Sequence, residues 1–136
     1  MVDIAITAAN VVAGTGATLA AGKAGATVSA GQVVYQDPTT GLYSPALNNS
    51  ATAAVRSPAG IALNGAAAGQ PLQVIQAGPV TIGGILTAGV MYYLSSTGGG
   101  ICPVADLGAG KYPAALGFAI STAVVSVKLQ EAGVSL

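Results

Sequence analysis

Side chains that could perform acid, base or nucleophilic chemistry are scarce in these 136 residues. The sequence has no histidine, and its four carboxylates, Asp3, Asp37, Asp106 and Glu131, stand far apart along the chain. Proton transfer needs a group within hydrogen-bonding reach of its target, and usually a second group that tunes it. Asp37, Asp106 and Glu131 fall in or beside predicted turns, where a solvated cap is the ordinary role of an acid. The sequence therefore predicts no catalytic acid or base.

The single thiol, Cys102, is a poor nucleophile in this context. A reactive cysteine needs a neighbouring histidine or cation, and no basic residue lies close to it in the sequence. One cysteine also cannot make an intramolecular disulfide or a site of several thiolates, and no acidic run resembles a calcium loop. The glycines of Gly14-Thr15-Gly16 do not continue into a dinucleotide loop, because the third position is Leu19. We therefore predict a protein that is not an enzyme and holds no cofactor or metal.

The tyrosines are the remaining side chains with a binding chemistry. They are Tyr35, Tyr43, Tyr92, Tyr93 and Tyr112. Exposed tyrosines could stack on bases or sugars, but most of these fall on predicted strands. Packing in the core or between lobes is therefore the favoured interpretation, since a buried tyrosine needs only one partner for its hydroxyl.

The composition restricts the partners of the chain. Four Lys and Arg residues balance four Asp and Glu residues for a net charge of zero, and charged residues make up only 6% of the sequence. Nucleic-acid binders gain most of their affinity from cations at phosphates, so direct nucleic-acid binding is not expected. A near-zero charge with 52% hydrophobic residues favours association. We expect part of the surface to be covered by copies of the chain or by another protein.

The N-terminal region shows neither a secretion signal nor a membrane span. Asp3 precedes the first apolar residues and no Lys or Arg does, unlike the positive start of a signal peptide. Residues 13–30 are interrupted by Gly, Thr, Ser and Lys23, so they lack the roughly 20 continuous apolar residues of a spanning helix. The sequence predicts a soluble protein made in a cytoplasm, with no membrane contact.

Short apolar runs between Gly and Pro residues predict strands rather than helices. We expect strands at residues 3–7, 32–36, 42–45, 60–63, 72–76, 80–82, 90–94, 101–104, 116–120 and 124–129. The segments 37–41 and 95–100 have turn composition. Ten short strands predict an all-β fold, either a short-stranded barrel or a sandwich.

An internal repeat is the most informative feature of the sequence. The run SAGQVVY at 29–35 matches TAGVMYY at 87–93, which places Gly31 on Gly89, 58 residues later. GIAL at 60–63 matches GFAI at 117–120, with a slightly smaller offset that a loop deletion explains. In this alignment Cys102 matches Ser44, so a small strand residue suffices there.

The repeat predicts two copies of one β unit, at 24–82 and 83–136, that pack into one compact domain. Neither copy alone buries enough apolar area to be stable by itself. Residues 1–23 precede the repeat as an extended N-terminal arm. We expect this arm to pair as an edge strand, to reach across to a neighbouring molecule, or to be a locally frayed tail.

A family resemblance appears at the repeat signature. Its elements are AGATVSAGQVVY at 24–35, GIAL at 60–63, GQPLQV at 69–74, LTAGVMYYLS at 86–95 and LGFA at 116–119. The chain resembles the small Ala/Gly/Val-rich structural proteins encoded among the head genes of tailed bacteriophages, several of which are capsid cement or decoration proteins. The resemblance covers roughly residues 24–136 and is one of pattern and composition.

The resemblance implies a virion protein assembled in the host cytoplasm and bound to the capsid exterior. Its partners would be the major capsid protein and further copies of itself, with a trimer favoured and a dimer possible. It would stabilise the expanded shell against the pressure of packaged DNA. From its position alone, the N-terminal arm is the expected capsid contact, and no site residues are carried over.

Two other functions fit the same features. A tail-fibre or baseplate connector subunit also uses Gly-rich β repeats and symmetric assembly. A non-viral surface or carbohydrate-binding β module would explain the tyrosines, although the sequence shows no secretion signal. Binding to purified shells separates the head protein from the connector.

Overall fold

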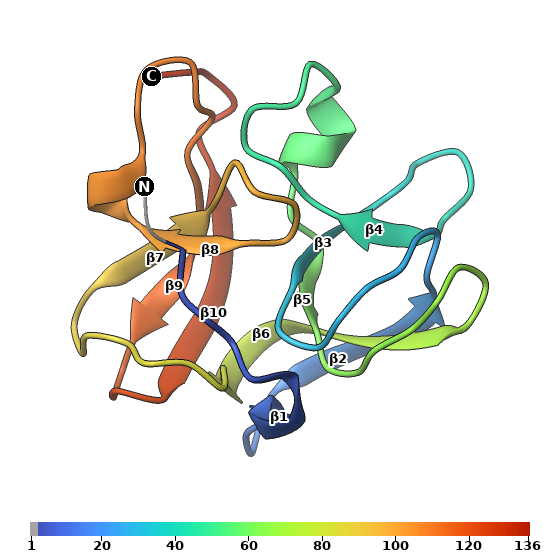
Figure 1. The fold of residues 1–136 in the computed structure, drawn as a ribbon, viewed down its shortest axis with the longest axis horizontal. Helices are drawn as coiled ribbons and strands as arrows, with labels where there is room; N and C mark the ends of the chain where they lie inside the picture. Colours follow the sequence, from blue (N-terminus) through green and yellow to red (C-terminus); the bar gives the residue numbers. More distant parts are fainter. Residues whose placement is uncertain (1–2) are drawn as a thin grey trace.

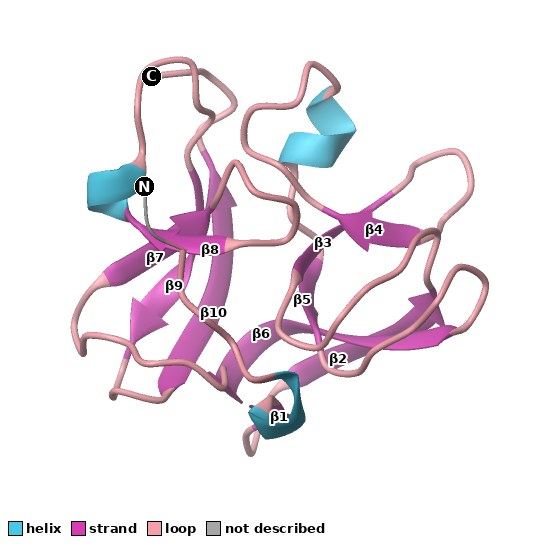
Figure 2. Cartoon of the chain, in the orientation of Figure 1, coloured by secondary structure: helices cyan, strands magenta, loops and turns pink. Residues whose placement is uncertain are grey.

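The computed structural model describes residues 3–136, except for the side chain of Asp106. Its strands form a curled antiparallel sheet, a half-barrel, with three short 3-10 turns at its margins (Figures 1 and 2). These turns are η1 (Ala8–Asn10), η2 (Ala53–Arg56) and η3 (Val104–Asp106). The predicted all-β fold class is therefore confirmed.

Ten strands make up the sheet in the described part of the chain. They are β1 (Val12–Ala13), β2 (Thr18–Lys23), β3 (Val33–Gln36), β4 (Tyr43–Pro45), β5 (Gly60–Ala62), β6 (Pro71–Thr81), β7 (Met91–Leu94), β8 (Ile101–Pro103), β9 (Ala114–Ala119) and β10 (Val124–Glu131). They lie in the order β4-β3-β5-β6-β10-β9-β7-β8, and β1 and β2 also pair with β6. β3 to β5 and β7 to β10 fall close to their predicted positions.

The predicted strands at 72–76 and 80–82 are one continuous strand, β6. We expected a turn between them because the sequence reads Ala-Gly-Pro there. Instead Gly78 takes a φ of 100°, so the backbone twists and continues as a strand. A Cβ at Gly78 would lie 2.8 Å from the Cα of Ala17, so a side chain would push away the segment that leads into β2.

Two further differences lie near the N-terminus. Residues 3–7 form no strand, and their backbone instead bonds to two separate elements: Ile4 N–H donates to the Ile101 carbonyl and Thr7 N–H to the Gly83 carbonyl, each at 2.9 Å. β2 was not predicted, because its sequence is rich in Ala and Gly and poor in the residues that favour strands. β2 forms because β6 lies beside it and pairs with it along its whole length.

The N-terminal segment pairs within the chain. Val12 of β1 lies opposite Thr81, and Gly22 of β2 lies opposite Leu72. β1 and β2 therefore take the edge-strand role that we expected for the arm, whereas residues 3–7 form no strand, and residues 1–2 lie outside the described residues. β1 and β2 pair within the chain's own sheet, so a contact of this segment with a partner has to come from its exposed side chains.

The strand pairing recurs along the chain at the predicted spacing. Val34 of β3 lies opposite Pro45 of β4, and 58 residues later Tyr92 of β7 lies opposite Pro103 of β8. In the sheet, β3 lies between β4 and β5, and β7 lies between β8 and β9 in the same way. The division of the chain into two repeated units itself stays a prediction.

The predicted turns at 37–41 and 95–100 also correspond in their hydrogen bonds. Asp37 Oδ1 accepts from the N–H of Thr39 at 2.8 Å, and Ser95 Oγ accepts from the N–H of Thr97 at 3.1 Å. Asp37 is thus a turn cap, which is the role the sequence predicted for it.

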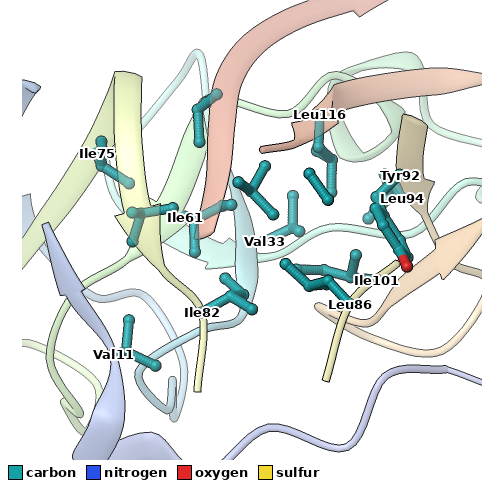
Figure 3. Close-up of a cluster of buried hydrophobic side chains, with 14 of the residues drawn as sticks. Val11, Val33, Ile61, Ile75, Ile82, Leu86, Tyr92, Leu94, Ile101 and Leu116 are labelled. Carbon is teal, nitrogen blue, oxygen red and sulfur yellow. The ribbon is translucent and has the colours of Figure 1, made fainter. Parts of the chain in front are cut away.

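Two clusters of buried side chains fill the fold. We call β2 to β5 with residues 71–76 the first half and β7 to β10 with residues 77–81 the second half; Figure 1 shows them on the right and the left, joined by β6. The smaller cluster lies within the first half and includes Val34, Tyr43 and Val74. The larger cluster joins both halves (Figure 3).

In the larger cluster, side chains of the first half pack against side chains of the second half. Val33 and Ile61 come from the first half and are fully buried. They belong to the same cluster as Leu94, Ile101 and Leu116 of the second half (Figure 3). Side chains on one face of the first half therefore complete the hydrophobic core of the second half.

The chain is compact without any partner. A folded monomer of 12.9 kDa is expected to expose about 6300 Å². This chain exposes 6261 Å². Its exposed apolar side chains are therefore a feature of the folded surface and do not reflect an open core.

One buried polar residue, Asn48, ties the halves together. Its backbone N–H donates to the Ser95 carbonyl at 3.1 Å, and its carbonyl accepts from the N–H of Tyr112 at 2.9 Å. Its side-chain Nδ2 donates to the Leu94 carbonyl at 2.8 Å. Asn48 is fully buried, so these bonds replace those that its backbone and Nδ2 would make to water, whereas its Oδ1 has no hydrogen-bond partner among the described residues.

Replacing Asn48 with alanine should destabilise the protein, because the Leu94 carbonyl loses its side-chain donor in a buried place. We expect Asn48→Ala to lower the free energy of unfolding by about 1–3 kcal/mol. Asn49→Ala, at an exposed position, is the matched control and should change it by less than about 0.5 kcal/mol. Urea unfolding measures both, and equal midpoints for the two variants would contradict this role of Asn48.

Two glycines explain the repeated Gly-x-Ala signature. A Cβ at Gly117 would overlap the carbonyl oxygen of Ser126, and one at Gly60 would overlap the carbonyl oxygen of Ile75. In both places the next strand passes too close for any side chain. Glycine is required there by the neighbouring backbone.

We therefore expect Gly117→Ala to cost at least about 2 kcal/mol of stability, because a backbone contact cannot yield as a side chain can. Gly108 has no atom within 4 Å of its Cβ position, so Gly108→Ala is the control. It should be neutral or slightly stabilising, by less than about 1 kcal/mol. Thermal unfolding of the two variants distinguishes them, and a stable Gly117→Ala protein would show that the β9–β10 spacing is wrong.

Candidate interaction surface

Three of the four carboxylates in the sequence, Asp3, Asp37 and Glu131, each accept hydrogen bonds from a different partner. Asp3 Oδ1 accepts a hydrogen bond from the Ser95 hydroxyl at 2.6 Å. Glu131 Oε1 accepts one from the Ser57 hydroxyl at 2.5 Å. The side chain of Asp106, for which we predicted a cap, lies outside the described residues. Among the described residues, no three His, Cys, Asp or Glu side chains gather as a metal site would require.

Cys102 is a buried strand residue. Its Sγ lies 4.0 Å from the Leu94 carbonyl oxygen. It is opposite Tyr93, just as Ser44 is opposite Tyr35 in the other hairpin. The position thus holds a small side chain in both hairpins, in agreement with the alignment of the repeat.

Two of the tyrosines are core residues. Tyr43 and Tyr92 are buried, and the Tyr92 hydroxyl accepts from the N–H of Thr87 at 2.9 Å. The Tyr43 ring lies over Gly22, where a Cβ would be 2.6 Å from Cε2. These two rings are therefore unavailable for stacking on a ligand.

Tyr112 lies in a small cleft between the halves. Arg56 stacks on its ring with the guanidinium carbon 3.7 Å from the centroid. The cleft has a volume of about 230 Å³ and is also lined by Ser57 and Glu131. Arg56 Nη1 in addition donates to the Ser50 carbonyl at 3.1 Å. The charged groups of this cleft are thus engaged in contacts within the chain.

Several large apolar side chains are exposed on the surface of the described chain. These side chains are Val12, Leu19, Ile85, Val104, Phe118, Ile120, Val134 and Leu136. Val12, Ile85, Phe118 and Ile120 come from segments that the sheet brings together near one end of β6 and β10. Scattered apolar residues need no explanation, but a contiguous group indicates a contact surface.

Phe118 is at the centre of one part of this surface. It is 52% exposed and lies opposite both Met91 on β7 and Ser126 on β10. Tyr93, two residues beyond Met91 on the same strand, shares its side of the sheet. We call these four residues the β9 face, and none of them is charged.

A second row of uncharged residues continues from the β9 face. Ile120 donates its N–H to the Val124 carbonyl at 2.9 Å. Val124 lies opposite Thr81, and Thr81 lies opposite Val12 on its other side. Side chains at directly opposite positions share one face of a sheet. The uncharged surface therefore extends from β9 across β10 and β6 to β1.

A shallow groove of about 690 Å³ lies at the end of this row. It runs between the N-terminal segment and the loop after β6, and it is lined by Ala5, Thr7, Val12, Thr81, Gly84 and Ile85 among others. Ile85 is 89% exposed. None of the residues that line the groove is charged. We call it the Val12 groove.

The sequence contained a signal for this surface that we did not use. Residues 116–120 read Leu-Gly-Phe-Ala-Ile, so apolar residues fall on both faces of β9. Such a strand is expected to be covered on both sides. In this chain one side faces the core and the other, with Phe118, faces outward.

No helix in the described part of the chain has the length and hydropathy to cross a membrane. Comparison with protein-family models, with curated proteins and with solved structures finds no match to this chain.

The buried state of Cys102 gives a direct test of the packing around β8. In the native protein, we expect a thiol reagent such as DTNB to react only through unfolding, so urea should accelerate labelling in step with loss of structure. Ala109→Cys adds an exposed thiol as a control and should react at once. Immediate labelling of Cys102 in the native chain would contradict its burial.

Proposed function

We propose that this chain is a structural virion protein that binds the outer surface of a tailed-bacteriophage head and stabilises the expanded capsid. The Val12 groove carries the proposal, because it is an uncharged groove, lined by both apolar and polar residues, on an otherwise compact chain. The resemblance of the repeat signature to phage head proteins supports the same function.

The groove fits an uncharged segment of the major capsid protein. Its walls are small residues, such as Ala5 and Gly84, with Val12 and Ile85 as the large side chains at its margin. The small side chains leave the backbone of the groove accessible to a partner. The exposed side chains of Val12 and Ile85 supply apolar surface for the contact. A charged partner segment would lose its hydration there without gaining an opposite charge.

Stabilisation of a shell requires no chemistry from the bound protein. A protein that binds the assembled shell and not its separate subunits stabilises assembly by mass action. At a concentration of 100 times the dissociation constant, one such site contributes about 2.7 kcal/mol. Many copies on one shell multiply this effect.

Binding should depend little on salt. The net charge is zero, and the groove residues carry no charge that ions could screen. Raising sodium chloride from about 50 to about 500 mM should leave the affinity for shells unchanged or slightly stronger, because salt does not weaken apolar contacts. Strong weakening by salt would indicate a different surface.

The proposal is tested by co-sedimentation of the purified chain with expanded phage shells. Ile85→Lys and Val12→Lys place charges at the groove and should weaken binding at least about tenfold. Val134→Lys, at a 66% exposed position after β10, is the matched control and should bind as the unchanged chain does. Circular dichroism would verify that all three variants are folded.

Failure of the unchanged chain to bind shells would overturn the proposal. Binding to purified tails instead would favour the connector function. Equal binding by the groove variants and the control would show that the Val12 groove is not the contact.

A further inference from the structure

We propose that residues 3–7 form a strap whose docking on the sheet positions one wall of the Val12 groove. Ile4 and Ile6 would then control shell binding, although they are not among the residues that line the groove. The inference rests on the proposed function and adds two positioning residues to it. It starts from the side chains of this segment, which forms no strand of its own.

Side chains along the strap alternate between two environments. Ile4 and Ile6 are half-buried and pack against the larger core cluster. Ala5 and Thr7 are exposed and line the Val12 groove. This is the alternation of a strand that has one face against a core. One side of the strap is thus an anchor, and the other side is part of the proposed contact.

Glycines make room for the two anchors. A Cβ at Gly31 would lie 2.6 Å from Ile6 Cγ2, and one at Gly84 would lie 2.5 Å from Ile4 Cγ2. Both distances are too short for real atoms, so the strap reaches this position only because neither residue has a side chain. Gly89 matches Gly31 in the repeat, and nothing lies within 4 Å of a Cβ there. The close approach at Gly31 is therefore made by the strap and is not a general feature of this turn.

Hydrogen bonds join the strap to the sheet at both of its ends. Asp3 accepts from the Ser95 hydroxyl at its start, and Thr7 N–H donates to the Gly83 carbonyl at its end. A segment outside the strands, with one side exposed, opens at a lower free energy than the sheet does. The packing of the two isoleucines between these ends therefore sets how much of the time the groove wall is in place.

Docking of the strap and binding at the groove favour each other. Release of the strap would remove Ala5 and Thr7 from the groove. The apparent dissociation constant for shells therefore rises in inverse proportion to the docked fraction. By reciprocity, a bound shell raises the docked fraction.

Hydrogen exchange of the full chain tests the docking without shells. Mass spectrometry of peptides that cover residues 3–7 should show faster exchange than peptides from β6 and β10. In the double variant Ile4→Ser with Ile6→Ser, exchange of the strap should accelerate at least about tenfold. Circular dichroism should show that the sheet of this variant remains folded.

Co-sedimentation with expanded shells then tests the control of binding. The double serine variant should bind at least about tenfold more weakly than the unchanged chain. Ile4→Val with Ile6→Val keeps apolar, branched anchors and should restore binding to within about threefold. Val104→Ser with Val134→Ser is the matched control, because it removes two exposed apolar side chains outside the strap and the groove, and it should bind as the unchanged chain does.

Exchange on the bound shell gives a readout that a purely structural role would not change. Shells should slow exchange of the strap in the unchanged chain, because they bind the docked form. Equal exchange with and without bound shells would overturn the inference. A double serine variant that exchanges the strap rapidly but binds shells with full affinity would overturn it as well.

The two halves of the experiment separate this inference from the proposed function. Failure of the unchanged chain to bind shells would overturn the proposed function, and with it the control of binding by the strap. Unaccelerated exchange in the double serine variant, with shell binding intact in the unchanged chain, would overturn only the role of Ile4 and Ile6.

Discussion

The hydrogen-bonding of one strand, β6, holds the rest of the molecule in place. This strand has eleven residues and pairs with β1, β2, β5 and β10, so it belongs to both halves of the sheet. Its continuity depends on Gly78, whose positive φ lets the backbone twist where the sequence suggests a turn. If β6 ended there, the two hairpin units would have no common backbone and the larger core cluster would not form.

The twist of β6 also decides which apolar surface is buried. It directs the outer face of the first half, with Ile61, into the curl of the second half. No part of the described chain covers the outer face of the second half, where Phe118 is exposed. The exposed apolar surface thus lies on the side of the second half that the rest of the described chain leaves uncovered.

The sequence predicted the elements that local rules determine. Alternating residues and turn formers located β3 to β5 and β7 to β10, and the offset of 58 aligned Cys102 with Ser44 in matching strand registers. It did not predict β2, whose Ala-rich sequence becomes a strand only because β6 lies beside it. The break expected at Gly78 was wrong because a glycine with a positive φ serves a twisted strand as well as a turn. The interaction surface was missed for a related reason: apolar residues on both faces of β9 show that both faces avoid water, but not which one the chain itself covers.

The central claim is that this chain belongs on the outside of a phage head, with the Val12 groove toward the shell. Cryo-electron microscopy of purified virions tests it most directly, with the chain fitted into density beyond the major capsid protein. The account predicts density on the outer shell in which Val12 and Ile85 face the capsid protein. Density only in the tail, or density on the shell with the groove facing solvent, would contradict it.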